Sequence, residues 1–130
     1  MQTYKDPQKP VDERVRDLLG MMTIEEKIAQ LTSVWLQFDP DGGVSPNQGM
    51  LAIEYDPNEV MRNGIGQITR PLGSQPLDPR EGARLVNKLQ RKLVEETRLG
   101  IPAICHEECL SGMMAQGATS FPSPLNYGAT

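Results

Sequence analysis

The stretch ICHEECLSGMMAQGATSFP, residues 104–122, gathers the residue types that could do chemistry. Within residues 105–109 it holds the only histidine of the chain, both cysteines and two adjacent glutamates. Three kinds of site use such residues. Thiolates and imidazoles bind zinc, a cysteine paired with a histidine can act as a nucleophile, and carboxylates can hold or cleave a polar substrate.

The spacing of these residues disfavours the metal and thiol alternatives. Zinc sites join a short pair of ligands to a second pair elsewhere, and the sequence has no second cysteine pair. Neighbouring side chains on a strand point to opposite faces, so Cys105 and His106 would diverge. Free cysteines often pack as small apolar residues. We therefore predict no metal ligands, a core position for Cys105 and Cys109, and a hydrogen-bonded polar role for His106.

The two glutamates fit a packing role less well. Ionised carboxylates directly after a buried strand are costly unless they are paired or face a cleft. Alternation sends Glu107 and Glu108 to different sides, so only one of them is expected to face a cleft. Arg70 follows an earlier predicted strand in the same way. It would either hold a substrate or neutralise a neighbouring glutamate.

The elements that must position these residues divide the chain into four segments. Residues 1–9 are polar and charged and are predicted to be flexible. Residues 10–34 have apolar positions at helical spacing and are predicted to form two short helices. Residues 35–64 are dense in Gly, Pro, Asn and Asp and are predicted to be a long surface loop. Residues 65–130 are predicted to form a strand, a helix, a second strand and a loop.

Local signals define the helices of the first and last segments. Thr23 and Glu26 fit a capping box, and the helix that they begin is predicted to bury Ile24, Ile28 and Leu31. A longer helix is predicted to begin at Pro79, which suits the first helical position, with Asp78 as its N-cap. Its predicted apolar face consists of Ala83, Leu85, Val86, Leu89 and Leu93.

The order strand, helix, strand in the last segment indicates a βαβ unit with parallel strands. The first strand is predicted around residues 65–70. Gly100 and Pro102 end the helix, and the sequence IPAIC, residues 101–105, is predicted to be the second strand. Two parallel strands leave open edges that α/β proteins avoid. We therefore expect an α/β fold that is the beginning of a larger one.

Composition excludes several classes of function. The formal net charge is −4 and the pI is near 5.0, and no basic run or basic helix face provides a footprint for nucleic acid. No apolar run reaches the ~18 residues that a membrane helix needs. The polar N-terminus lacks the apolar core of a secretory signal, so a chain that starts at Met1 is expected to be cytoplasmic.

Four motifs resemble glycoside hydrolase family 3, in the order in which that family has them. They are MMTIEEKIAQL (21–31), NGIGQITR (63–70), RLGIPAICHEECLSG (98–112) and GATSFPSPLNYGAT (117–130). The HEEC version resembles the β-xylosidase and β-glucosidase types. The resemblance covers essentially the whole chain and identifies it as the N-terminal part of a (β/α)8 TIM-like barrel, incomplete in this chain.

The resemblance implies a retaining, exo-acting enzyme that removes terminal β-xylosyl or β-glucosyl residues without a cofactor. Glu108 matches the acidic position that binds sugar hydroxyls in the −1 subsite, and Arg70 is a second candidate contact. The nucleophile and the acid/base are expected beyond Thr130, so no catalytic residue is predicted here. The expected partners are the carbohydrate substrate, the remainder of the barrel and a second domain. The alternative is a non-catalytic half-barrel that binds sugar or a partner.

Overall fold

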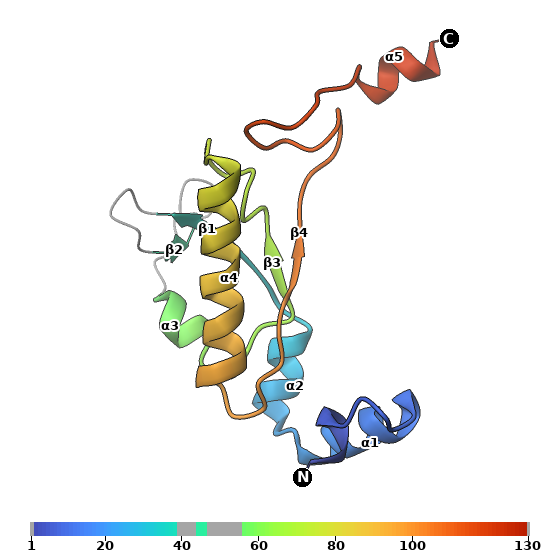
Figure 1. Ribbon diagram of the computed structural model, residues 1–130, viewed down its shortest axis with the longest axis vertical. Coiled ribbons are helices and arrows are strands. Elements are labelled where there is room, and N and C mark those ends of the chain that lie inside the picture. The colour runs from blue at the N-terminus through green and yellow to red at the C-terminus, as the bar shows by residue number, and fades with distance from the viewer. Residues whose placement is uncertain (1, 39–43, 47–55, 130) are drawn as a thin grey trace.

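The chain combines helices with a small sheet (Figure 1). The structure, a computed structural model, describes residues 2–38, 44–46 and 56–129. No helix in these ranges is long and apolar enough to cross a membrane. The elements in chain order are η1 Thr3–Lys5, α1 Val11–Met21, α2 Ile24–Gln30, β1 Ser33–Phe38, β2 Val44–Pro46, α3 Pro57–Val60, β3 Gln67–Thr69, α4 Pro79–Glu96, β4 Ile104–His106 and α5 Pro124–Gly128.

The sheet has the strand order β2-β1-β3-β4. β1 pairs with β3 and β3 with β4 in parallel, whereas β2 pairs with β1 antiparallel. The register places Trp35 beside Thr69 and Thr69 beside His106. β3 and β4 therefore end at the same level, opposite Trp35 of β1, and β1 continues to Phe38. In Figure 1 the chain leaves this edge at the top and continues to α5, which projects away from the sheet.

The predicted βαβ unit is confirmed as β3, α4 and β4. Asp78 caps α4 by accepting the Arg80 N–H at 2.9 Å, and Pro79 occupies the first turn. α4 runs along the sheet in Figure 1 and buries Leu89 and Leu93. These two leucines join a core cluster with Val34, Met61, Ile65, Ile68 and Ala103. Ala83, predicted to lie on this apolar face, is exposed.

The predicted loop over residues 35–64 is wrong in part. β1 runs to Phe38, β2 covers Val44–Pro46 and α3 covers Pro57–Val60, while residues 39–43 and 47–55 lie outside the described ranges. The predicted helical pair over 10–34 also extends too far, because α2 ends at Gln30. β1 is stabilised by its pairing with β3, and local turn signals in the sequence carry no information about this pairing.

Two predictions for the N-terminal third are also wrong. Residues 1–9 are not a flexible segment throughout, since Tyr4 is buried in η1 and its hydroxyl donates to the Leu99 carbonyl at 2.6 Å. Ile24, Ile28 and Leu31 do not form a buried stripe, because they are 65%, 58% and 90% exposed. The residues that α2 buries are Glu26 and Ala29.

Burial of Glu26 depends on Arg98, which follows α4. The guanidinium Nε donates to Oε1 of Glu26 at 2.8 Å, and Nη2 donates to Oε2. The other Glu26 contacts form the predicted capping box with Thr23, which is confirmed. The hydrogen bond from Arg98 holds the pKa of Glu26 below its ordinary value of 4.5, and burial opposes this effect. The pair ties the start of α2 to the loop before β4.

Because of the Glu26 carboxylate, the free energy of unfolding should decrease as the pH falls into the acidic range. A folded-state pKa below that of the unfolded chain gives stability that is complete above about pH 4.5 and is lost as the pH falls through the folded value. At pH 7 we expect Glu26→Gln to lower the free energy of unfolding by about 1–3 kcal/mol, measured by urea unfolding. The difference from the wild type should shrink below about pH 4.5.

The matched control is Glu95→Gln, which removes an exposed surface partner of Arg91 at 3.8 Å. Such pairs contribute about 0–1 kcal/mol. A difference between Glu26→Gln and the wild type that stays constant from pH 7 to pH 3 would contradict the assignment.

Gly66 lies where α2, β3 and β4 meet. Its N–H donates to the Ala29 carbonyl and its carbonyl accepts the Ile104 N–H, both at 2.9 Å. A Cβ at this position would lie 1.9 Å from the Gln30 carbonyl oxygen. Because backbone atoms fill this space, a side chain there forces the end of α2 away from the sheet.

Two glycine-to-alanine substitutions should therefore have opposite effects. Gly66→Ala should lower the free energy of unfolding by about 3 kcal/mol or more, the upper part of the range for overpacking. Gly20→Ala, in α1 with nothing within 4 Å of its Cβ position, should raise it by about 0.5–1 kcal/mol. Denaturant midpoints compare the two, and a Gly66→Ala variant as stable as the wild type would refute the close approach.

Candidate functional site at the carboxyl edge of the sheet

A pocket of about 350 Å³ lies at the carboxyl edge of the parallel strands. Each strand contributes to it: Trp35 comes from β1, Thr69 and Arg70 from the end of β3, and Glu108 follows β4. The segment after β4 completes the lining with Leu110, Ser111 and Met114. The pocket therefore combines one carboxylate, one guanidinium, two hydroxyls and an indole ring.

Arg70 is held in place by backbone and ring contacts. Its backbone has φ 50°, a left-handed conformation that is uncommon outside glycine. Its N–H donates to the His106 carbonyl at 2.8 Å, and its guanidinium lies 5.4 Å from the centre of the Trp35 ring. The Arg70 Nε is buried and has no hydrogen-bond partner. Within the described ranges Arg70 forms no ion pair, so the predicted alternative of a salt bridge to a neighbouring glutamate is not seen.

The two glutamates diverge, as strand alternation predicts. The Glu107 carboxylate turns to the loop after β3, where Oε1 accepts the Leu72 N–H at 2.6 Å and Oε2 accepts the Gly73 N–H at 3.1 Å. Glu108 is exposed and lines the pocket. Of the two carboxylates, Glu108 is the one placed to meet a ligand. Its contact with a sugar stays a prediction.

The other residues of the CHEEC motif, residues 105–109, lie in different environments. His106 Nε2 lies 3.1 Å from the Thr69 hydroxyl, so it is the hydrogen-bonded polar residue that was predicted. Cys105 is half-buried against the core, where burial raises the pKa of its thiol. Cys109 is exposed, so its predicted core position is wrong. The chain has already left the sheet after His106, which removes the alternation that would bury it.

The described ranges hold no group of three or more His, Cys, Asp or Glu side chains that could bind a metal ion. Cys105 and His106 belong to one strand, and their side chains take different partners. The Cys105 Sγ accepts a hydrogen bond from Gln90 Nε2 of α4 at 3.4 Å, whereas His106 forms a hydrogen bond with Thr69. The motif therefore does not act as one cluster.

Trp35 is one of the pocket residues that sequence reasoning missed, because it fell in the predicted loop. Its indole Nε1 donates to the Ser74 hydroxyl at 2.6 Å. The signal that could have found it is the run SVWLQF, residues 33–38, in which apolar and polar residues alternate in part. Thr69, Ser111 and Met114 also line the pocket and were not singled out from the sequence.

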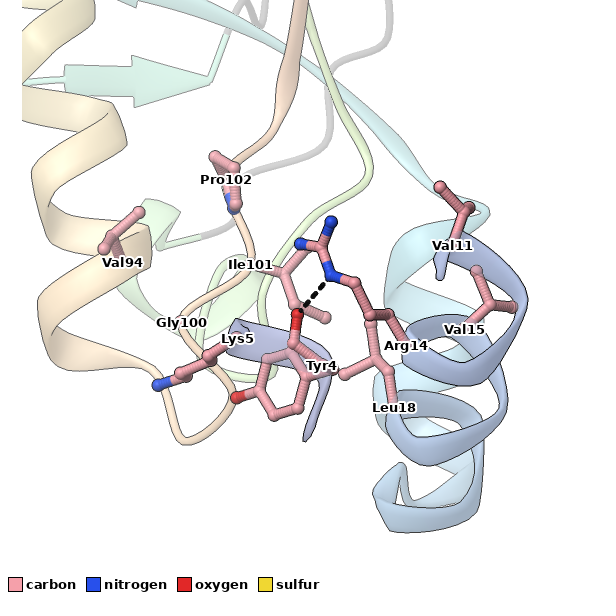
Figure 2. Close-up of a pocket in the computed structure, with 10 residues that line it drawn as sticks. All are labelled: Tyr4, Lys5, Val11, Arg14, Val15, Leu18, Val94, Gly100, Ile101 and Pro102. Carbon is pink, nitrogen blue, oxygen red and sulfur yellow. Dashed lines mark hydrogen bonds between the residues drawn. The ribbon is translucent and has the colours of Figure 1, made fainter. Parts of the chain in front are cut away.

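A second cavity, of about 520 Å³, lies among residues of η1, α1 and the segment before β4. Figure 2 shows Tyr4 at its centre, with the Arg14 Nε donating to the Tyr4 carbonyl at 2.9 Å. Gly100, Ile101 and Pro102 border it, and they precede β4 rather than follow it. The lining is largely apolar and contains no carboxylate, so it offers less to a sugar than the carboxyl-edge pocket.

The fold and the pocket define an α/β protein whose candidate site lies at the carboxyl ends of parallel strands, where α/β enzymes bind their ligands. The chain belongs to glycosyl hydrolase family 3: residues 23–130 match the family's N terminal domain. The resemblance seen in the four sequence motifs is thereby confirmed.

Named relatives agree with this membership. The chain is 34% identical to a protein of Formosa agariphila named "Putative beta-xylosidase" over 98% of its own length and 16% of the relative. It is 38% identical to "Probable beta-glucosidase C" of Aspergillus oryzae and 32% identical to "Beta-glucosidase C" of Emericella nidulans, each over 76% of this chain and 15% of the relative. The chain thus spans about a sixth of the length of the relatives it matches.

Proposed function

We propose that this chain is the N-terminal part of a retaining β-glycosidase that removes terminal β-D-xylosyl or β-D-glucosyl residues from oligosaccharides or glycosides. Membership of family 3 and the names of the relatives support this proposal. The single observation that carries it is the position of Glu108. This carboxylate lines a pocket at the carboxyl edge of the sheet, next to Arg70 and Trp35.

Glu108 suits the binding of a sugar rather than bond cleavage. A carboxylate accepts two directional hydrogen bonds, which matches neighbouring hydroxyls on a pyranose ring, and such charge-assisted bonds are strong. A retaining glycosidase needs two carboxyl groups ~5 Å apart. Glu108 is the one carboxylate among the residues that line the pocket. We therefore assign it to the −1 subsite and place the nucleophile and the acid/base beyond Thr130, in a mechanism that uses no cofactor.

The proposal also includes further chain packed on this one, as the rest of a (β/α)8 TIM-like barrel and a second domain. Unpaired apolar surface supports this part. β4 is the last strand of the described sheet, and Ile104 on it is 67% exposed. The stripe Ile24, Ile28 and Leu31 on α2 is exposed as well. A next barrel strand would pair with β4, and neighbouring elements would cover these side chains.

Steady-state kinetics of Glu108→Ala test the proposal, with the full-length protein and p-nitrophenyl β-D-xyloside and β-D-glucoside as substrates. Hydrogen bonds that strengthen in the transition state should be lost, so kcat/KM should fall about a hundredfold or more. The 130-residue chain alone should not exceed the background rate.

Cys109→Ser is the matched control, because Cys109 is an exposed neighbour of Glu108 that does not line the pocket. It should retain kcat/KM within about twofold, as expected for a surface substitution. Wild-type kinetics in Glu108→Ala would remove Glu108 from the site. Sugar binding by a full-length protein that hydrolyses neither substrate would instead favour the non-catalytic alternative.

A further inference from the structure

Glu107 spans from the end of β4 to the turn that follows β3. Its two carboxylate oxygens accept the backbone N–H groups of Leu72 and Gly73, at 2.6 and 3.1 Å, from residues 35 and 34 positions earlier in the chain. Both hydrogen bonds are charge-assisted, the stronger kind. Glu107 is not among the residues that line the pocket. The carboxylate therefore acts on the turn and not directly on a ligand.

The turn transmits this restraint to two residues that do line the pocket. The Gly73 carbonyl accepts a hydrogen bond from Arg70 Nη2 at 2.9 Å. The Ser74 hydroxyl donates to the Arg70 carbonyl at 2.7 Å and accepts from Trp35 Nε1 at 2.6 Å. The Arg70 guanidinium in turn lies over the Trp35 ring. Arg70 and Trp35 together form one wall of the pocket, here called the Arg–Trp wall.

The backbone of the turn is under constraint, which is why it needs such an anchor. Arg70 has a positive φ of 50°, and residues in this region persist only where their surroundings hold them. A Cβ on Gly73 would lie 2.7 Å from Glu107 Oε2 and 2.6 Å from the Met114 carbonyl oxygen. The turn therefore fits closely between the Glu107 carboxylate and the segment after β4.

We propose that Glu107 is a positioning residue of the site: its carboxylate fixes the turn 70–74 and thereby sets the Arg–Trp wall against the ligand that Glu108 holds. The identity of that ligand, a terminal β-xylosyl or β-glucosyl unit, rests on the proposed function. The wall presents an aromatic ring and a guanidinium, which suit the apolar face and the hydroxyls of a pyranose. The two adjacent glutamates thus have different roles: Glu108 binds the ligand and Glu107 fixes the turn 70–74.

The first test uses no ligand. The test uses the 130-residue chain, in which Trp35 is the only tryptophan. The fluorescence of this chain therefore reports on the Arg–Trp wall. Glu107→Ala should shift the emission to longer wavelength, because the ring loses its fixed neighbours. Arg70→Ala should shift it too, and the double variant should shift no further than the larger single shift, since coupled residues are not additive. Glu107→Gln, which keeps one acceptor oxygen, should give a smaller shift than Glu107→Ala.

The outcomes of this test separate positioning from general destabilisation. Glu95→Ala, which removes an equal charge from an exposed site on α4, should leave the emission unchanged. Far-UV circular dichroism checks that each variant is folded. If Glu107→Ala does not fold, the emission of Glu107→Gln decides the test. Emission of Glu107→Ala and Glu107→Gln equal to the wild type, or a double variant whose shift is the sum of the two, would overturn the proposal.

The second test measures the ligand side in the full-length protein. Glu107→Ala should raise KM by about tenfold, the loss expected for one charge-assisted hydrogen bond. In an Arg70→Ala background the same substitution should raise KM by less than about twofold. Unchanged KM in Glu107→Ala would overturn the role in binding. Wild-type kinetics in Glu108→Ala would instead remove Glu108 from the site, and a full-length protein that hydrolyses neither substrate would refute the proposed function. In both cases the emission test would still decide whether Glu107 fixes the wall.

Discussion

The site depends on the parallel register of β1, β3 and β4. This register brings Trp35, Thr69 and His106 into one row across the sheet. The residues that follow β3 and β4 then leave the sheet at a common edge, which is why Arg70 and Glu108 line one pocket although they are distant in sequence. Parallel strands have this property in general, and α/β proteins place their ligand sites at such edges. The pocket therefore depends first on the parallel pairing of β1, β3 and β4, which brings its lining residues together.

Side chains from outside the sheet maintain the register. α4 covers the sheet with Leu89 and Leu93, which pack with the fully buried Ile68 of β3. Arg98 then ties the loop before β4 to the start of α2 through Glu26. Close backbone contact at Gly66 completes the junction of helix and strands. Hydrophobic burial fixes the layers, and the Arg98–Glu26 pair joins the loop before β4 to α2.

Local signals in the sequence predicted the elements whose ends are determined locally. The capping box at Thr23 and the cap at Asp78 are present, and the βαβ unit has the predicted order. β1 was not predicted, because a short strand before a turn-rich segment is recognised by its pairing with β3. The exposed stripe on α2 was misassigned for a related reason: an apolar pattern shows that a face seeks a partner but does not say which part of the protein provides it.

The candidate site was predictable to a similar degree. Alternation indicated that Glu107 and Glu108 diverge, and the family resemblance selected Glu108. The role of Glu107 depends on backbone amides 34 and 35 residues away, and no spacing within the CHEEC motif contains that information. Trp35 was missed together with β1, although it forms the wall with Arg70. Side chains that act through tertiary contacts are the ones that sequence patterns leave out.

A crystal structure of the full-length protein with bound xylose or glucose tests the central claim most directly. We expect the sugar in the carboxyl-edge pocket, with its hydroxyls within hydrogen-bond distance of Glu108 and its ring against the Arg–Trp wall. Glu107 should keep its contacts with the N–H groups of Leu72 and Gly73. A sugar bound at the cavity beside Tyr4, or a Glu107 that has left the turn to contact the sugar, would contradict the account.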